Sequence, residues 1–274
     1  MNDSTDPELR FQTTSAVVDG LTIRYTVQPN PGKDTILLLS PWPESIYAWW
    51  PIWPYLAPEH SLATVDLPGF GQSEARPDLM SPKAMGSFIP KILTALELQR
   101  PHIVGPDVGT AALLYTAALH PETIARITIG GGAAAFPLQA TGLLQQFIEA
   151  PNLDPFRQLD PAEIVTGAAR SIPGYTAPEF VIDDYINSYT GSRFVDSINY
   201  VRSYPEDLAN LAPLLSTINT PVHILAAKND PYLRLTDPEQ LHRVLPNSRL
   251  TILHNSHNAW EEDPEAYAAA ITNQ

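Results

Sequence analysis

The stretch Gly105-Pro106-Asp107-Val108-Gly109 decides the fold of this chain. The apolar run 101–104 precedes it, and the segment 110–119, which has the composition of a helix, follows it. A strand, a short turn with glycine at both ends and a helix form the sequence context of a nucleophile elbow. In such an elbow the central side chain projects outward from a tight corner, where larger flanking side chains would collide. The central residue is commonly serine, but here it is Asp107.

Composition bounds the size of the protein and the kind of partner it can take. The chain has 274 residues, enough for one large domain with an insertion. With 16 basic and 30 acidic residues its net charge is −14, which disfavours nucleic acids and anionic lipid and favours a small neutral or weakly polar organic substrate. Cysteine is absent, which excludes disulfides and thiolate catalysis. We find no zinc-ligand spacing, phosphate loop or dinucleotide fingerprint, so neither a metal nor a cofactor is expected.

The amino-terminal segment 1–10 bears on the location of the protein. It is polar and acidic and has no apolar signal core. No later apolar run reaches the ~18 residues that a membrane-spanning helix needs. We therefore expect a cytoplasmic protein without membrane association, while the oligomeric state stays open.

Apolar runs alternate with helical segments over most of the chain, which predicts a doubly wound, mostly parallel sheet of the α/β class. A hairpin is expected around Asp19 and Gly20. The segment 133–213 differs, because prolines divide it into short helical pieces and it has no clear buried strand. We interpret it as a helical cap on a core domain formed by 1–132 and 214–274. The strands expected after the hairpin cover 35–39, 62–65, 101–104, 125–129, 222–227 and 249–253, and helices are expected to begin near 47, 82, 110, 238 and 266.

Two further polar residues follow later strands. Asp230 comes shortly after the predicted strand 222–227, and His257 follows the predicted strand 249–253. In open α/β sheets the chemistry collects at the carboxyl ends of the strands, so Asp107, Asp230 and His257 are expected to meet at one site. Their order along the chain is nucleophile, acid and histidine, which is the order of a catalytic triad on this kind of sheet.

A carboxylate at the elbow favours attack on saturated carbon. Attack on a carbonyl would give an anhydride, which is less stable than the starting ester or amide, whereas attack on an sp3 carbon with a leaving group gives an ordinary alkyl ester. His257, oriented and made more basic by Asp230, can then activate water to hydrolyse that ester. The backbone N–H groups of Trp42 and Val108 are placed to receive the negative charge that develops in this step.

The chain resembles the α/β-hydrolase fold superfamily, and within it the branch of epoxide hydrolases and haloalkane dehalogenases that use an aspartate nucleophile. The resemblance covers nearly the whole chain outside the segment 133–213. It implies a catalytic triad, an oxyanion hole, a cap domain and hydrolysis of an epoxide or a related electrophile. It rests on the elbow and on 66–73, 120–122, Asp230, His257 and 262–264.

The chain departs from the pattern of this branch in its substrate-facing positions. Ser40 and Pro41 stand where the family usually has histidine and glycine. Val108 follows the nucleophile where dehalogenases have tryptophan or arginine, so halide recognition of that kind is not expected. Epoxide hydrolases hold the epoxide oxygen with cap tyrosines, one of them directly before an arginine, and here the tyrosine stands one place early. The candidate substrate-binding residues are Trp42, Tyr175, Tyr189 and Tyr200, with Tyr185 and Tyr204 as alternatives.

The residues also allow other interpretations. Asp107 is suited to cap the following helix, Asp230 to begin an Asp-Pro turn, and His257 to lie on a surface loop. Haloalkane or haloacid dehalogenation would use the same covalent route. A non-hydrolytic enzyme such as a cyclase or lyase, or a ligand-binding module, would reuse the elbow carboxylate as a base or a binding group. Two tyrosine hydroxyls directed at one point above Asp107 would favour the epoxide hypothesis, and one or none would favour the non-hydrolytic one.

Overall fold

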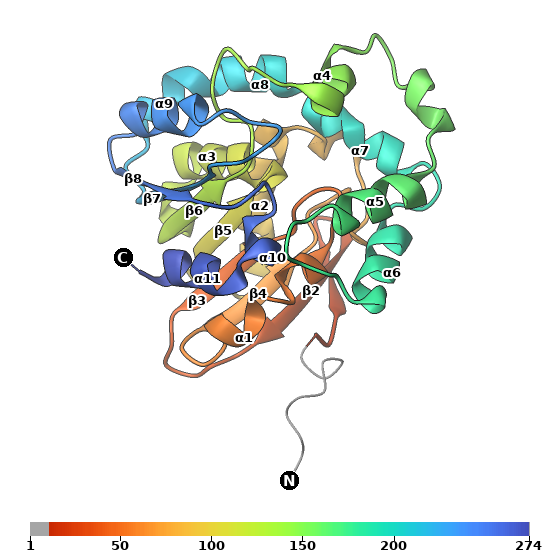
Figure 1. Ribbon diagram of the computed structural model, residues 1–274. Coiled ribbons are helices and arrows are strands. Elements are labelled where there is room, and N and C mark those ends of the chain that lie inside the picture. Colours follow the sequence, from red (N-terminus) through yellow and green to blue (C-terminus); the bar gives the residue numbers. More distant parts are fainter. Residues whose placement is uncertain (1–10, 274) are drawn as a thin grey trace.

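The computed structural model describes residues 11–273 and contains one eight-stranded sheet (Figure 1). Its strand order is β1-β2-β4-β3-β5-β6-β7-β8. β2 pairs antiparallel with β1 and with β4, and all other neighbours are parallel, which confirms the predicted α/β class. The strands are β1 Thr14–Val18, β2 Leu21–Gln28, β3 Thr35–Leu39, β4 Ser61–Val65, β5 His102–Pro106, β6 Arg126–Gly130, β7 Val222–Ala227 and β8 Ser248–Leu253.

Helices cover both faces of the sheet, which is why its central strands are continuous apolar runs. In β3, for example, every residue from Ile36 to Leu39 is buried. α2 (Pro82–Ala95) and α3 (Val108–Leu119) lie on one face, and α1 (Trp53–Leu56) and α11 (Pro264–Thr272) lie on the other (Figure 1). α3 packs against β5 and is buried along most of its length, so the strand and the helix on either side of the elbow both belong to the core.

The aromatic segment after β3 differs from the prediction. A helix was expected to begin near 47, but the chain forms the 3-10 turn η2 (Ile46–Trp49) and the single helical turn α1. Pro51 and Pro54 explain the interruption, because proline has no N–H group to donate within a helix. Trp49 and Trp53 are nevertheless fully buried, so the segment still contributes to the core.

Helices and 3-10 turns fill the chain between β6 and β7, where the described residues form no strand. Figure 1 shows α4 to α7 gathered on one side of the molecule. The division into a core and a cap at 132/133 and 213/214 stays a prediction. These elements are α4 Gly142–Glu149, η5 Asp154–Gln158, α5 Pro161–Arg170, α6 Glu179–Ser188, α7 Arg193–Arg202, α8 Tyr204–Leu211 and η6 Ala212–Thr217. The described residues also form η3 Pro77–Leu79, η4 Pro121–Thr123, α9 Thr236–Val244 and α10 Ala259–Glu262.

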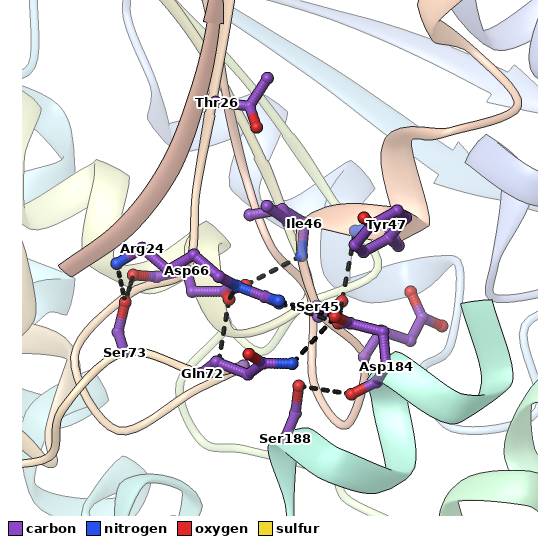
Figure 2. A network of polar contacts seen from close by, with 12 residues as sticks. Arg24, Thr26, Ser45, Ile46, Tyr47, Asp66, Gln72, Ser73, Asp184 and Ser188 are labelled. Carbon is purple, nitrogen blue, oxygen red and sulfur yellow. Dashed lines mark hydrogen bonds and ion pairs between the residues drawn. The ribbon is translucent and has the colours of Figure 1, made fainter. Parts of the chain in front are cut away.

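A network of charged groups fastens α6 to the core (Figure 2). Arg24 of β2 donates through Nε to Asp66 at 2.6 Å and through both Nη atoms to Asp184 of α6 at 2.7 and 2.9 Å. Asp184 also accepts from the hydroxyl of Ser45 at 2.6 Å and from the side-chain amide of Gln72 at 2.9 Å. Because Ser45 ends the loop that follows β3, this network fixes α6 against that loop.

The structure bears on only one of the two observations behind the expected location of the protein. The segment 1–10, which was expected to lack a signal core, lies outside the described residues. Among residues 11–273, no helix has the length and apolar character needed to cross a lipid bilayer.

Candidate active site

Asp107 lies on a strained corner between β5 and α3. Its φ is 51° and its ψ is −122°, a combination that residues with a side chain rarely adopt. A Cβ atom at position 105 would lie 2.6 Å from a methyl group of Leu113, so a larger residue there would force that side chain to move, whereas one at position 109 would meet only ordinary contacts. Position 132, outside the elbow motif, requires glycine more strictly than position 105 does. A Cβ atom there would lie 2.0 Å from the backbone carbonyl oxygen of Asp107. The chain after β6 must therefore pass the elbow as bare backbone.

The carboxyl group of Asp107 contacts the loop after β3 and the first residue of α3, but it does not cap that helix. Asp107 occupies the N-cap position of α3, but its side chain accepts no capping hydrogen bond. Its Oδ2 accepts instead from the backbone N–H of Trp42 at 2.6 Å, and the N–H of Val108 also donates to the carboxyl group. Burial raises the pKa of Asp107, and the charge of His257 and these two hydrogen bonds offset only part of that rise.

Asp230 and His257 form a hydrogen-bonded pair beside the elbow. His257 Nδ1 and Asp230 Oδ2 are 2.8 Å apart, while Asp230 Oδ1 accepts from the backbone N–H groups of Tyr232 at 2.8 Å and Leu233 at 3.1 Å. Burial lowers the pKa of His257, but the hydrogen bond and charge of Asp230, together with the charge of Asp107, raise it above its ordinary value. Because Asp230 engages Nδ1, Nε2 is the ring nitrogen left to act on water.

A cavity of about 160 Å³ brings these groups together. Asp107, His257 and Trp42 all lie on its wall, and no lysine or arginine does so among the described residues. The opposite wall is apolar, which suits a substrate without charge. The helices between β6 and β7 contribute Leu143, Leu144, Phe147, Ile164, Phe194 and Val201 to it.

A model of the alpha/beta hydrolase fold family matches residues 34–264. The chain belongs to this family. It is 23% identical to an uncharacterized hydrolase, YugF of Bacillus subtilis, over 93% of this chain and 94% of that protein. Similar solved structures include an enol-lactonase from Burkholderia xenovorans (TM-score 0.77, 16% identity, 95% of this chain and 98% of the other) and epoxide hydrolase A from Mycobacterium thermoresistibile (TM-score 0.77, 19% identity, 94% and 96%). Because these two names describe different reactions, the likeness to solved structures shows the fold alone, and the reaction must be argued from the geometry of the site.

The tyrosines of this α/β hydrolase are distributed differently from the prediction. Tyr189 donates its hydroxyl to the carbonyl oxygen of Glu44 at 3.0 Å, and Tyr200 donates to that of Val108 at 2.7 Å. The hydroxyl of Tyr175 is buried without a hydrogen-bond partner among the described residues. None of these three tyrosines lies on the cavity wall.

Tyr204 and Tyr232 line the cavity instead. Tyr204, the first residue of α8, is only 2% exposed, and burial together with the charge of Asp107 raises the pKa of its hydroxyl. That hydroxyl has no hydrogen-bond partner among residues 11–273. Tyr232 sets its ring edge-on against His257, with centroids 4.9 Å apart. Tyr204 was an alternative candidate in the sequence analysis. Tyr232 was not predicted to line the site, although its position in the same loop as Asp230 could have indicated it.

The side chain of Trp42 is held by α7. Its indole Nε1 donates to the hydroxyl of Ser197 at 2.8 Å, and its ring stacks on Phe194 with centroids 5.5 Å apart. Trp42 thus donates its backbone N–H to Asp107 and its indole N–H to Ser197 of α7. This second contact ties the position of the loop after β3 to that of α7.

A buried pair of glutamates borders the cavity. No local sequence pattern predicts this pair. Glu44 lies on the wall and accepts from the side-chain amide of Asn258 and from Trp260 Nε1, the latter at 3.2 Å. Glu261 accepts from the hydroxyl of Tyr185 at 3.1 Å and is within hydrogen-bonding reach of Glu44. Burial raises the pKa of both carboxyls, that of Glu261 to about 8. The pair therefore holds a proton at neutral pH, because two buried carboxylates in contact cannot both ionise.

Proposed function

We propose that this α/β hydrolase opens small, neutral, largely apolar epoxides through a covalent ester on Asp107. The observation that carries the proposal is the setting of that carboxyl group. It stands on a strained elbow, borders a mainly apolar cavity, and receives the N–H groups of Trp42 and Val108. A carboxylate presented in this way suits attack on saturated carbon, which leaves a stable ester for a second step.

In the first step a carboxylate oxygen of Asp107 attacks an epoxide carbon, and the bond from that carbon to the ring oxygen breaks. The ring oxygen takes a proton from the hydroxyl of Tyr204; the place of Tyr204 on the wall and the lack of a hydrogen-bond partner for its hydroxyl within 11–273 support this role. Tyr232 is a second tyrosine on the same wall. The products of this step are a hydroxyalkyl ester of Asp107 and a tyrosinate.

In the second step His257 acts as a base on water. Alkylation removes the negative charge of Asp107, which is one of the influences that raise the pKa of His257, so the imidazole loses its proton more readily once the ester exists. His257 takes a proton from water, and the water oxygen attacks the ester carbon. The N–H groups of Trp42 and Val108 hold the oxyanion, each donor being worth ~3 kcal/mol. The bond from the ester carbon to the alkyl oxygen then breaks, and that oxygen takes the remaining proton of the attacking water, so the diol leaves and Asp107 is again a carboxylate. The proton on His257 returns to the tyrosinate.

The His257→Gln variant tests this sequence of steps. Given a panel of small apolar epoxides, it should gain the mass of the epoxide on the peptide that contains Asp107, because attack survives and hydrolysis does not. Asp107→Asn is the matched control and should gain no mass. In wild-type enzyme, repeated turnover in heavy-oxygen water should place solvent oxygen in Asp107. No adduct with any epoxide of the panel would overturn the proposal.

Two other reactions would give different results in the same experiments. Dehalogenation would release halide from haloalkanes. The indole N–H of Trp42 already donates to Ser197, so it does not support halide binding.

A non-hydrolytic reaction that uses Asp107 as a base has one observation in its favour. Tyr204 is the sole tyrosine of the helices α4 to α8 on the cavity wall in the described part of the chain. That reaction would leave Asp107 without solvent oxygen.

A further inference from the structure

A second cavity, of about 240 Å³, lies at the amino-terminal edge of the sheet. His102 begins β5 and pairs in register with Arg126, which begins β6. His223 near the start of β7 pairs with Arg249 near the start of β8. All four side chains line the cavity. Because β5 runs from this cavity to the elbow, the cavity is at the edge of the sheet opposite to Asp107.

This cavity is basic although the protein is acidic. No aspartate or glutamate lies on its wall among the described residues, and Asp34 is the acidic residue whose charge reaches Arg126. Burial, followed by the charge of Arg126, lowers the pKa of His102 to about 3, and burial with the charge of Arg249 lowers that of His223 to about 4. Both imidazoles are therefore neutral at neutral pH. The positive charge comes from Arg126 and Arg249, which repel each other.

Two residues of this cavity, buried His102 and exposed Arg249, have side-chain nitrogen atoms without a hydrogen-bond partner among the described residues. His102 is 4% exposed; its Nε2 bonds to the hydroxyl of Thr128 at 2.8 Å, while its Nδ1 is buried without a partner in the described residues. When Thr128 donates to Nε2, the neutral ring carries its proton on Nδ1, and a buried donor without an acceptor is costly. Arg249 donates through Nη2 to His223 and to carbonyl oxygens near the carboxyl end, which leaves its Nη1 and Nε without partners within 11–273.

We propose that this cavity binds a small, doubly charged oxyanion of the phosphate or sulfate type. Arg126 and Arg249 supply the two opposing charges, and guanidinium groups match the geometry of tetrahedral oxyanions. The anion removes the repulsion between the arginines and stabilises the folded chain, because it binds a site that exists only after folding.

Calorimetric titration of the full chain with inorganic phosphate tests the site, in an oxyanion-free buffer with ionic strength held by sodium chloride. We expect saturable binding at one site. Arg249→Gln should weaken it by roughly tenfold to a hundredfold, the effect of losing a hydrogen bond to a charged group. Arg170→Gln, an arginine on α5 whose side chain is 62% exposed, is the matched control and should bind like the wild type. Heat that does not saturate in the wild-type protein would overturn the proposal.

Two further measurements separate loss of the binding site from loss of the folded structure. Arg249 also bonds to the carboxyl-terminal segment, so circular dichroism should first show that the variant is folded, and Arg126→Gln provides a second variant with the same expected loss. Phosphate should shift the imidazole nitrogen signals of His102 in NMR spectra of the wild-type protein, and unmoved signals would contradict the site. Sulfate should compete with phosphate, and acetate should not. Glycerol phosphate that binds as tightly as phosphate would assign the site to phosphate monoesters, and weaker binding would assign it to the free ion; either result supports an oxyanion site.

Discussion

Replacing Asp230 by asparagine should stop His257 from acting as a base while leaving Asp107 able to attack. In the wild-type protein Asp230 Oδ1 accepts the N–H groups of Tyr232 and Leu233, and Oδ2 accepts from His257 Nδ1. An asparagine keeps its oxygen toward the two backbone N–H groups, so its NH₂ group faces Nδ1. The imidazole must then accept at Nδ1 and carry its proton on Nε2, and in that form it cannot take a proton from water.

The size of this effect follows from the cost of turning the amide round. The productive tautomer needs the asparagine oxygen against Nδ1, which leaves the N–H groups of Tyr232 and Leu233 facing an NH₂ group. At about 1–3 kcal/mol for each unsatisfied donor, this reversal costs roughly 2–6 kcal/mol. Since about 1.4 kcal/mol corresponds to a factor of ten, hydrolysis of the ester should slow by about 30-fold to 10⁴-fold. The upper end matches the loss of about 10⁴ for the same change in a serine protease triad.

Quenched rapid mixing with mass spectrometry measures both steps, because the alkylated chain is heavier by one epoxide. In Asp230→Asn we expect the ester to form at close to the wild-type rate and then to accumulate. Asp230→Ala lets the imidazole adopt either tautomer and should hydrolyse the ester faster than Asp230→Asn does. Asp183→Asn, exposed on α6, should behave like the wild type. An asparagine variant that hydrolyses the ester faster than the alanine variant would refute the tautomer argument.

The same structure makes four further predictions. Tyr204→Phe should slow alkylation by about 10²-fold or more, the contribution of a positioned proton donor, and should leave ester hydrolysis unchanged in the same rapid-mixing assay. Asp184→Asn should lower the free energy of unfolding in urea by about 1.5–3 kcal/mol, because Arg24 loses a charged hydrogen-bonding partner in a nearly buried network. The pKa of Glu261 is raised in the folded state, so Glu261 favours folding while it is protonated. The free energy of unfolding should therefore fall as the pH rises from 4.5, the ordinary pKa of a glutamate, to about 8. Urea titrations at several pH values measure this dependence, and Glu261→Gln should remove it. Asp107→Asn should lower the pKa of His257 in NMR titrations, because a negative charge that raises it is gone.

Matched variants and contrary outcomes accompany these predictions. Tyr55→Phe, at an exposed position, should alkylate like the wild type. Lys33→Met breaks an exposed ion pair and should cost less than about 1 kcal/mol, which sets the scale for the Asp184 variant. A Glu261→Gln protein whose stability still falls over the same pH range would assign that dependence to another group. A pKa of His257 that rises in Asp107→Asn would contradict the account of how its basicity changes between the two steps.

The fold and the three polar residues of the site were predictable because each depends on a local pattern. Continuous apolar runs marked the parallel strands, and Asp107, Asp230 and His257 each follow one of them. A parallel sheet brings the carboxyl ends of its strands to one edge, so their meeting needed no knowledge of packing. The role of Asp107 as a nucleophile goes beyond that reasoning, and it stays a proposal that the trapping experiment decides.

The cap tyrosines show what a single sequence does not supply. Tyr200 near the end of α7 and Tyr204 at the start of α8 are four residues apart, yet the hydroxyl of Tyr200 donates to the carbonyl oxygen of Val108, whereas Tyr204 lines the cavity. Which of them faces the substrate depends on how two short helices meet at Ser203, and composition does not determine that. The contact between Glu44 and Glu261 is harder still to foresee, because only the folded sheet brings the two segments together.

The charges around the cavity bear on the choice between substrates. Asp107 and Glu44 lie on its wall, and Asp230 and Glu261 stand behind them; Asp230 raises the pKa of Asp107, and Glu261 and Asp107 raise that of Glu44. A haloacid would bring a further carboxylate to a wall where the described residues offer no lysine or arginine, and only His257 could balance it. A neutral epoxide brings no charge until its ring opens, and a hydroxyl on the wall can then neutralise the oxygen. The electrostatics of the cavity therefore favour an epoxide over a haloacid, whichever tyrosine donates the proton.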